Sequence, residues 1–307
     1  MRTALDRIIA YKVDEVASLK RERSESNLLQ AAKAQSAPRG FANRLSDIAE
    51  TQDNALICEM KRKSPSAGEI LPGADPSEIA VQYERGGAAC RSVLTDGPSF
   101  GGSIEDFVAI RAAVSLPMLR KDFMIDTIQV AEARANGADA VLVILSCTDD
   151  ALAADLVQAA HELEMDALIE THDATEVERA LALPSSLIGI NNRDLKIMKT
   201  DLATSETLSH LIPEGMDFVS ESGISDVEDI SRLRKTGARR FLIGESLMKR
   251  ADRESHVQAL RAARCAISYA RFPKKTSRLY SRGINPSAKI RKGLAQHCHG
   301  PCSGEYS

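Results

Sequence analysis

The sequence predicts a (β/α)₈ barrel that is preceded by a helical extension. Eight short apolar runs alternate with amphipathic segments along the chain. Successive runs begin 21 to 35 residues apart, which is about one βα unit each. Gly-Ala pairs at 87–88, 137–138 and 237–238 precede three of the runs, where a turn from helix to strand favours a C-capping glycine.

The predicted strands span 55–61, 90–96, 117–123, 140–146, 166–172, 187–194, 218–224 and 240–246. The predicted helices span 75–87, 103–114, 126–137, 149–163, 173–183, 225–237 and 247–267, and several open on Asp or Ser as an N-cap. Eight such units in series are what a closed barrel requires. A doubly wound sheet is the alternative fold, but it favours a G-x-G-x-x-G loop that this sequence lacks.

Three segments follow from these patterns. Residues 1–50 form an extension with one or two helices, beginning with the amphipathic stretch MRTALDRIIAYKVDEV, whose acidic residues disfavour a targeting peptide. Residues 51–270 form the catalytic barrel. Residues 271–307 carry eight Lys or Arg against one acid and little periodicity, which is typical of a disordered basic tail.

Composition narrows the classes of partner. The net charge of -3 among 307 residues argues against nucleic acid as a partner of the barrel, although the basic tail leaves RNA or a partner protein open as a hypothesis. No apolar run approaches the roughly 18 residues of a membrane span. Six scattered cysteines indicate reduced thiols and a cytoplasmic protein.

Ionisable residues gather where the predicted strands end. In a barrel these ends converge on one mouth, which is where barrel enzymes carry out chemistry. Glu59 and Lys61 are two residues apart and therefore share a face of their strand. Arg62 points the other way and is predicted to be structural. The further strand-end residues are Lys121, Asp122, Glu170, Asn191, Arg193, Glu221 and Ser222.

The last two strands end in SESGIS and FLIGESLM. Loops after strands 7 and 8 form the recurrent phosphate site of such barrels. Backbone N–H groups at Gly223, Gly244 and Glu245 are placed to donate to phosphate oxygens. The alternative is that these glycines serve only as turns.

Six motifs, taken in order, resemble the indole-3-glycerol-phosphate synthase family. They are CEMKRKSPSAG, LPMLRKDFMID, DALIETHD, IGINNRDLK, SESGI and FLIGESLM. The resemblance runs to about residue 268 and implies a (β/α)₈ barrel with a helical extension over its mouth. It also implies closure of the indole ring, decarboxylation and dehydration of 1-(2-carboxyphenylamino)-1-deoxyribulose 5-phosphate. No cofactor or metal is expected.

The resemblance also implies roles for residues at the mouth. Lys121 matches the general acid, and Glu170 matches the acid–base group of the dehydration. Lys61 matches the lysine that holds the substrate carboxylate, and Glu59 the glutamate near the anilino nitrogen. Asn191 matches the amide that bonds the reacting hydroxyl.

Other residues are expected to bind substrate. Arg193 would orient the charged network and Ser222 would contact substrate. Phosphate contacts are expected from Ser64, Gly223, Gly244 and Glu245. A lysine acid works best with a lowered pKa, and Lys61 and Arg193 are expected to lower the pKa of Lys121.

The tail contains HCHGPC, which brings together His297, Cys298, His299 and Cys302. Soft metals bind such residues, but this spacing matches no standard zinc pattern. The sequence therefore predicts no metal site.

Two other functions remain open on the residues alone. A class I aldolase or sugar-phosphate isomerase would use Lys121 as a Schiff base or a carboxylate as a proton shuttle. A non-catalytic binder of a phosphorylated ligand would show affinity without turnover. The sequence leaves the oligomeric state open between monomer and dimer.

Overall fold

The computed structural model describes residues 3–264, except for 52, 66, 186 and 196. The predicted tail 271–307, with His297, Cys298, His299 and Cys302, lies outside the described residues.

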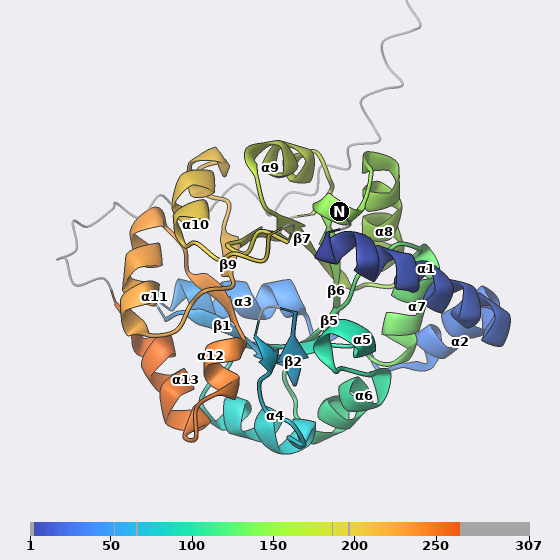
Figure 1. Cartoon of the computed structure of the whole chain (residues 1–307), viewed down its shortest axis with the longest axis horizontal. Helices are drawn as coiled ribbons and strands as arrows, with labels where there is room; N and C mark the ends of the chain where they lie inside the picture. The colour runs from blue at the N-terminus through green and yellow to red at the C-terminus, as the bar shows by residue number, and fades with distance from the viewer. Residues whose placement is uncertain (1–2, 52, 66, 186, 196, 265–307) are drawn as a thin grey trace, which may run out of the picture. The chain divides into compact units, whose positions relative to one another are not determined.

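A closed barrel of eight parallel strands forms the centre of the described region, in the order β1, β10, β9, β8, β7, β6, β5, β4 (Figure 1). The strands are β1 (Ala55–Met60), β4 (Cys90–Leu94), β5 (Met118–Lys121), β6 (Ala140–Ile144), β7 (Asp166–Thr171), β8 (Leu187–Asn191), β9 (Phe218–Glu221) and β10 (Arg240–Ile243). All eight predicted strands are confirmed. Each ends one to three residues before its predicted end, so part of the polar mouth is built from loops.

Helices follow the strands and surround the barrel. They are α4 (Pro76–Arg85), α5 (Gly97–Phe100), α6 (Ile104–Ala113), α7 (Thr127–Ala135), α8 (Asp150–Glu162), α9 (Ala174–Leu181), α10 (Ala203–Leu208), α11 (Val227–Leu233), α12 (Glu245–Met248) and α13 (Arg253–Ala262). Three 3₁₀ turns are η1 (Leu145–Cys147), η2 (Ser209–Leu211) and η3 (Arg234–Thr236). The predicted eighth helix is therefore two helices, α12 and α13, separated by a short connection.

The ends of these helices carry the capping residues that the sequence predicts. The side chains of Asp75 and Ser103, for example, accept hydrogen bonds from backbone N–H groups in the first turns of α4 and α6. At the other ends, Gly87, Gly137 and Gly237 have φ values of 87°, 88° and 93°. Glycine adopts this left-handed conformation without a Cβ penalty. The Gly-Ala pairs are therefore confirmed as turns from helix to strand.

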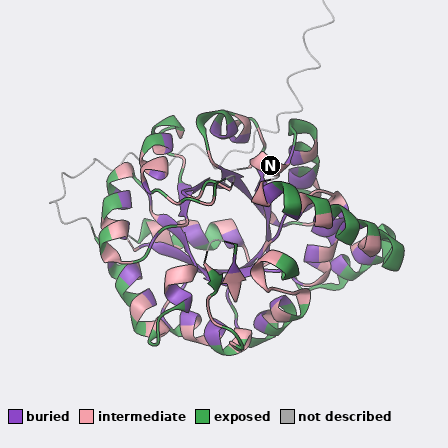
Figure 2. Cartoon of the chain, viewed as in Figure 1, coloured by how far each residue is buried: buried purple, intermediate pink, exposed green. Residues whose placement is uncertain are grey.

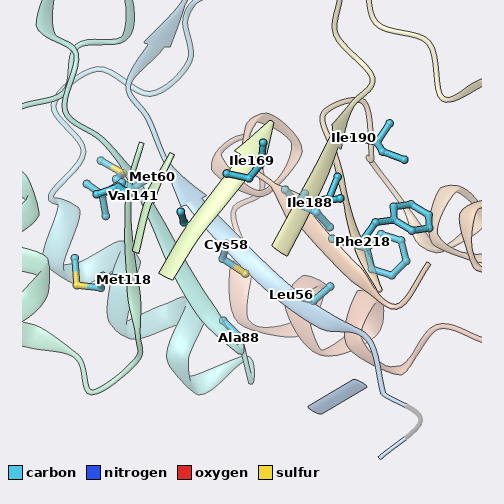
Figure 3. Packing of buried hydrophobic residues seen from close by; sticks show 14 of the residues in the cluster. Leu56, Cys58, Met60, Ala88, Met118, Val141, Ile169, Ile188, Ile190 and Phe218 are labelled. Atoms are coloured by element: carbon cyan, nitrogen blue, oxygen red, sulfur yellow. The ribbon is translucent and has the colours of Figure 1, made fainter. Parts of the chain in front are cut away.

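Period-2 alternation divides the strand side chains into two layers. On β1, Leu56, Cys58 and Met60 point outward and pack with apolar residues of the surrounding helices (Figure 3). Ala55 and Ile57 point into the barrel and join a separate inner cluster. Buried residues accordingly follow the strands and the inner faces of the helices, while exposed residues cover the outside (Figure 2). This alternation fixes which strand-end side chains reach the mouth.

The N-terminal extension contains three helices, α1 (Ala4–Glu22), α2 (Glu25–Ala34) and α3 (Phe41–Glu50), where one or two were predicted. Phe41 and Leu45 of α3 are fully buried against the inner cluster, and the backbone N–H of Ala42 donates to Asp166 at the start of β7 over 2.9 Å. Helix α3 therefore covers the amino-terminal end of the barrel. Helix α1 contacts the opposite end, where the Tyr11 hydroxyl donates to Asp96 over 2.7 Å.

A short antiparallel hairpin follows β1 and was not predicted. It pairs β2 (Lys63–Ser64) with β3 (Gly68–Glu69). The segment KSPSAGE lies between the predicted strand 55–61 and the predicted helix 75–87, where the sequence predicts no further strand. Because each strand is two residues long, the hairpin leaves too weak a periodic pattern to be recognised from sequence.

Candidate active site at the barrel mouth

The inward positions of five strands change from apolar to polar as the chain approaches the mouth, and those of a sixth, β10, end in a glycine. On β1 the inward series is Ala55, Ile57 and Glu59, and Lys61 follows just beyond the strand. The same alternation brings to the mouth Lys121 after Leu119, Glu170 after Leu168, Asn191 after Gly189, Glu221 after Val219 and Gly244 after Leu242. These residues lie close together because parallel strands of a barrel end at one rim.

Lys121 lies at the centre of the cluster. Its Nζ is 2.7 Å from Glu221 Oε2, 3.4 Å from Glu170 Oε2 and 3.8 Å from Glu59 Oε2. The Lys61 Nζ is 2.6 Å from Glu59 Oε1. The side chain of Lys121 keeps 14% exposure while the three carboxylate side chains keep at most 4%. Two cations and three acids thus share a small and largely dehydrated volume.

The expectation of a lowered pKa at Lys121 is wrong for this structure. Burial does favour a lower pKa, but the carboxylates of Glu221, Glu170 and Glu59 outweigh it and raise the pKa well above its ordinary value. The reasoning from sequence counted the neighbouring cations and left the acids out. Lys121 is therefore a firmly protonated ammonium, able to donate a proton or hydrogen bond to a developing negative charge.

The pKa values of two acids in the cluster, Glu170 and Glu221, shift in opposite directions. Burial opposes ionisation of Glu170, but the charges of Lys121 and His172 and the amide of Asn191 bring its pKa below the ordinary value. Burial and the neighbouring Glu170 raise the pKa of Glu221, against the effect of Lys121. Close carboxylates whose environments separate their pKa values are the usual basis of paired acid and base roles.

Glu221 is a site residue whose role the sequence analysis missed, although it named Glu221 among the strand ends. Its inward parity on β9 was the available signal. The fold makes room for it, since a Cβ on Gly189 of β8 would lie 2.1 Å from Glu221 Oε1. Gly244 does the same for another acid, because a Cβ there would lie 2.3 Å from Glu59 Oε1. These glycines provide space for carboxylates in addition to their effect on the backbone.

A cavity of about 720 Å³ opens beside the loops that follow β9 and β10. Ser222 and Gly223 both have left-handed backbones, with φ of 66° and 81°, and the buried Asn192 amide donates to the Glu221 and Ser222 carbonyls over 2.9 and 3.1 Å. The residues that line the cavity and bear on anion binding are Lys61, Arg193, Ser222, Gly223, Gly244, Glu245, Lys249 and Arg250. Four of these are cations, and Lys249 and Arg250 were missed because they lie just after the short helix α12.

Glu245 contributes a carboxylate to this cavity as well as its backbone N–H. Its Oε1 is 2.7 Å from Lys249 Nζ and its Oε2 is 3.6 Å from Arg193 Nη2. Burial opposes its ionisation, but Lys249, Lys61 and Arg193 lower its pKa. The carboxylate therefore lies between two cations that line the cavity.

A second, narrower cavity adjoins the first around Glu59, Lys61 and Arg193. It contains Lys121, Glu170 and Asn191 together with an apolar wall of Leu94, Phe100, Phe123, Leu142 and Ile144. Ser64 also lines this cavity, and its hydroxyl accepts a hydrogen bond from the Ala67 backbone over 3.1 Å. The structure thus places Ser64 nearer to Lys121 than the sequence analysis expected for a phosphate contact.

Two other strand-end charges have partners on the outer side. Arg62 forms an ion pair with Asp106 of α6, which includes an Nη2–Oδ1 hydrogen bond of 3.0 Å. This confirms that Arg62 points away from Lys61. Asp122 bonds Lys12 of α1 over 2.8 Å and Arg120 over 3.2 Å. Asp122 consequently anchors the N-terminal extension next to Lys121.

Within the described residues, no set of three or more His, Cys, Asp or Glu side chains has an arrangement that could hold a metal ion. In the same part of the chain, no helix combines the length and apolar character needed to cross a bilayer.

A closed eight-stranded parallel barrel with acid and base groups at the carboxyl ends of its strands defines the class of (β/α)₈-barrel enzymes. A solved structure of thiamine phosphate pyrophosphorylase from Pyrococcus furiosus shares this fold, with a TM-score of 0.50 and 14% sequence identity over 71% of this chain and 95% of that chain.

The particular family follows from sequence. The model of the family described as indole-3-glycerol phosphate synthase matches residues 5–260. The protein of that name from Hyphomonas neptunium is 63% identical over 86% of this chain and all of its own length. Those of Rhodospirillum rubrum and Bordetella pertussis are 48% and 45% identical over 80% and 82% of this chain, and over 94% and 96% of their own lengths. The chain belongs to the indole-3-glycerol phosphate synthase family.

Proposed function

We propose that the chain converts 1-(2-carboxyphenylamino)-1-deoxyribulose 5-phosphate into indole-3-glycerol phosphate, carbon dioxide and water. The observation that carries the proposal is the Lys121 ammonium, held within 2.7 to 3.8 Å of three carboxylates beside a cation-lined cavity. Ring closure needs a proton donor at the substrate ketone, and dehydration needs acid and base groups on the same small volume. The binding partner of the chain would be this phosphorylated small-molecule substrate.

The two cavities fit the two ends of this substrate. The phosphate would lie in the larger cavity, against backbone N–H groups of Gly223, Gly244 and Glu245 and near Lys249 and Arg250. The carboxyphenyl ring would lie along the apolar wall of the second cavity. That cavity holds about 60 Å³, which is less than an aromatic ring requires, so binding requires the surrounding side chains to move.

The roles at the reacting atoms follow from charge. Lys121 would donate a proton to the ketone oxygen as the aromatic carbon attacks. Lys61 would hold the substrate carboxylate until carbon dioxide leaves, and Glu59 would accept from the anilino nitrogen. Glu170 would act as acid and base in the dehydration, and Asn191 would hydrogen-bond the hydroxyl that leaves.

Residues around these groups would complete the site. Arg193 and Ser222 would contact substrate, and Ser64 would shape the cavity beside Lys121. The proposed division of the chain is an extension over 1–50, a catalytic barrel over 51–270 and a basic tail over 271–307. The free thiols of Cys58, Cys90 and Cys147 support a reducing, cytoplasmic location.

The test is a fluorescence assay for indole-3-glycerol phosphate, run on the wild type and on Glu170→Gln. Glutamine keeps the size of the side chain but cannot transfer a proton as a carboxyl group does, so the rate should fall by roughly 10²- to 10⁴-fold. Product formation by the wild type is required, and its absence rejects the proposed reaction. A near-normal rate in Glu170→Gln removes Glu170 from the mechanism.

A class I aldolase reaction is the alternative for a buried lysine. It requires a neutral amine that attacks a carbonyl carbon, whereas the three carboxylates hold Lys121 in its ammonium form. Borohydride added with substrate should therefore leave Lys121 unlabelled. Covalent labelling of Lys121 would support the aldolase.

A further inference from the structure

The inward face of the β7 chain continues past Glu170 to His172. The imidazole Nε2 of His172 lies 3.3 Å from Glu170 Oε1, so the two groups are at ion-pair distance. The Glu170 Oε2 faces the opposite way, toward Lys121 at 3.4 Å. One carboxylate therefore contacts the proposed proton donor with one oxygen and a histidine with the other.

The other ring nitrogen of His172 is held by α9. Its Nδ1 is 2.9 Å from Glu176 Oε2, and the same oxygen accepts the backbone N–H of His172 over 2.8 Å. His172 keeps only 12% side-chain exposure, and its Nε2 has no aligned hydrogen-bond partner. Glu176 thus holds the Nδ1 end of the imidazole, and the Nε2 end faces Glu170.

A separate cavity lies behind this histidine. It holds about 260 Å³ and is lined by His172, Asp173 and Glu176, by residues of β8 and the β8–α10 connection, and by Leu5 and Ser146. Asn191 borders both this cavity and the one that contains Lys121. A third cavity therefore lies beside the acid–base cluster, next to Asn191.

We propose that His172, held by Glu176, is a positioning residue that orients Glu170 and exchanges a proton with it. The inference rests on the proposed function, because it extends the role of Glu170 in dehydration. In the direction that supplies an acid, the proton on Nε2 moves to Glu170 Oε1 and leaves a neutral imidazole whose Nδ1–H still bonds Glu176. In the reverse direction, a proton that Glu170 takes from substrate moves to Nε2.

The charges around His172 favour its imidazolium form in the resting site. Burial favours a lower pKa, but Glu170 and Glu176 outweigh it and raise the pKa of His172 to about 10. Around it, Glu170 approaches from β7 and Glu176 from α9, and the other charged groups of the cavity are Asp173, Asp194, Lys199 and Asp201. An imidazolium between two carboxylates can give up a proton to one while the other stabilises the ring.

A purely structural role for the pair makes a different prediction. Glu176 lies in the first turn of α9, after the N-cap Asp173, and its bond to the His172 backbone stabilises that turn. A glutamine at 176 retains an acceptor for this bond. The structural role does not require residue 172 to titrate, nor its free nitrogen to face Glu170.

The test compares His172→Gln, Glu176→Gln and the control Glu178→Gln, which changes an exposed glutamate of the same helix. Single-turnover rates are measured with saturating enzyme from pH 6 to 10, so that product release does not mask chemistry. We expect His172→Gln to lower the rate by roughly 10-fold or more, with substrate affinity changed less than about two-fold. In Glu176→Gln the alkaline limb of the profile should move about one unit lower. The control should match the wild type.

Three outcomes overturn the inference. They are an unchanged rate in His172→Gln, an unchanged alkaline limb in Glu176→Gln, and a neutral His172 at pH 7 in nitrogen-15 NMR of the wild type. A wild type that forms no indole-3-glycerol phosphate rejects the proposed function instead. A working wild type whose variants have unaltered profiles rejects only the role of His172.

Discussion

Lys121 and Lys12 are two buried lysines with nearly the same surroundings and different uses. Lys121 contacts Glu59, Glu170 and Glu221, while Lys12 contacts Glu15, Asp96 and Asp122. The two clusters meet at neighbouring positions of the chain, since Lys121 of one and Asp122 of the other are adjacent. Alternation after β5 sends Lys121 into the barrel and Asp122 outward to α1.

The two clusters differ in the exposure of their lysine and in whether one of their acids can hold a proton. The Lys12 side chain keeps 2% exposure, against 14% for Lys121, which lines a cavity. At the mouth, burial and Glu170 raise the pKa of Glu221, so that acid is able to hold a proton. In the Lys12 cluster, burial favours a higher pKa for Asp122, but the positive charges of Arg120 and Lys12 outweigh it and lower that pKa. The same residue types thus give a reactive cluster where the lysine itself lines a cavity and a structural one where the lysine is almost fully shielded.

The largest effect should come from removing the charge at the mouth. Lys121→Met is expected to lower turnover by roughly 10²- to 10⁴-fold, because it removes the proposed proton donor. Its free energy of unfolding should change less than that of Lys12→Met, since Glu221 can take up a proton when the cation is lost. Turnover assays and urea unfolding measure the two quantities.

The control for that variant is Lys235→Met, which changes an exposed lysine of η3. It should leave both turnover and stability close to the wild type. A Lys121→Met protein that unfolds as readily as Lys12→Met would remove the distinction between the clusters.

The next effect concerns stability. Lys12→Met should lower the free energy of unfolding by about 3–5 kcal/mol, because it leaves buried carboxylates without their cation. Turnover of the protein that remains folded should fall much less than in Lys121→Met. Chemical denaturation at pH 7 measures the loss, and a change below 1 kcal/mol would contradict a structural role for this cluster.

The dependence of stability on pH tests the role of the Lys12 cluster further. The folded-state pKa of Asp122 lies below its ordinary value, so its stabilising effect is present at neutral pH and is lost as the pH falls through that pKa. In Lys12→Met, protonation of Asp122 relieves the unpaired charge. The stability difference between wild type and variant should therefore narrow below about pH 4. A difference that stays constant from pH 7 to pH 3 would contradict this account.

A smaller effect is expected where the fold makes room for an acid. Gly189→Ala places a Cβ that would lie 2.1 Å from Glu221 Oε1, so it should displace Glu221 and lower turnover by roughly 10-fold. In a Glu221→Ala background the same change should cost little, because the clashing oxygen is gone. Additive losses in the double variant would show that Gly189 acts independently of Glu221.

The smallest effect on activity should come from the outward-facing charge beside the site. Arg62→Met removes an ion pair with Asp106 and should lower stability by about 1–3 kcal/mol, with turnover within roughly three-fold of the wild type. Steady-state kinetics and urea unfolding test this directly. A loss as large as that of Lys121→Met would place Arg62 in the reaction.

The sequence by itself determined the barrel, its eight strands and the convergence of Glu59, Lys61, Lys121 and Glu170. Local patterns are sufficient for this, because period-2 alternation predicts which side chains point inward and the βα spacing predicts a barrel whose strands end at one rim. The same parity was present for Glu221 and His172. Their importance depends on neighbours from other strands and helices, which local patterns do not specify.

Only the tertiary structure decided the electrostatics. The pKa of Lys121 is raised because three acids from different strands surround it, whereas the expected effect of Lys61 and Arg193 was the opposite. The pairing of Lys12 with Asp122 joins positions 110 residues apart, and the rear cavity behind His172 is formed by segments that follow β6, β7 and β8 together with Leu5 of α1. Charge interactions depend on distance and burial in three dimensions, and neither is contained in the order of residues alone.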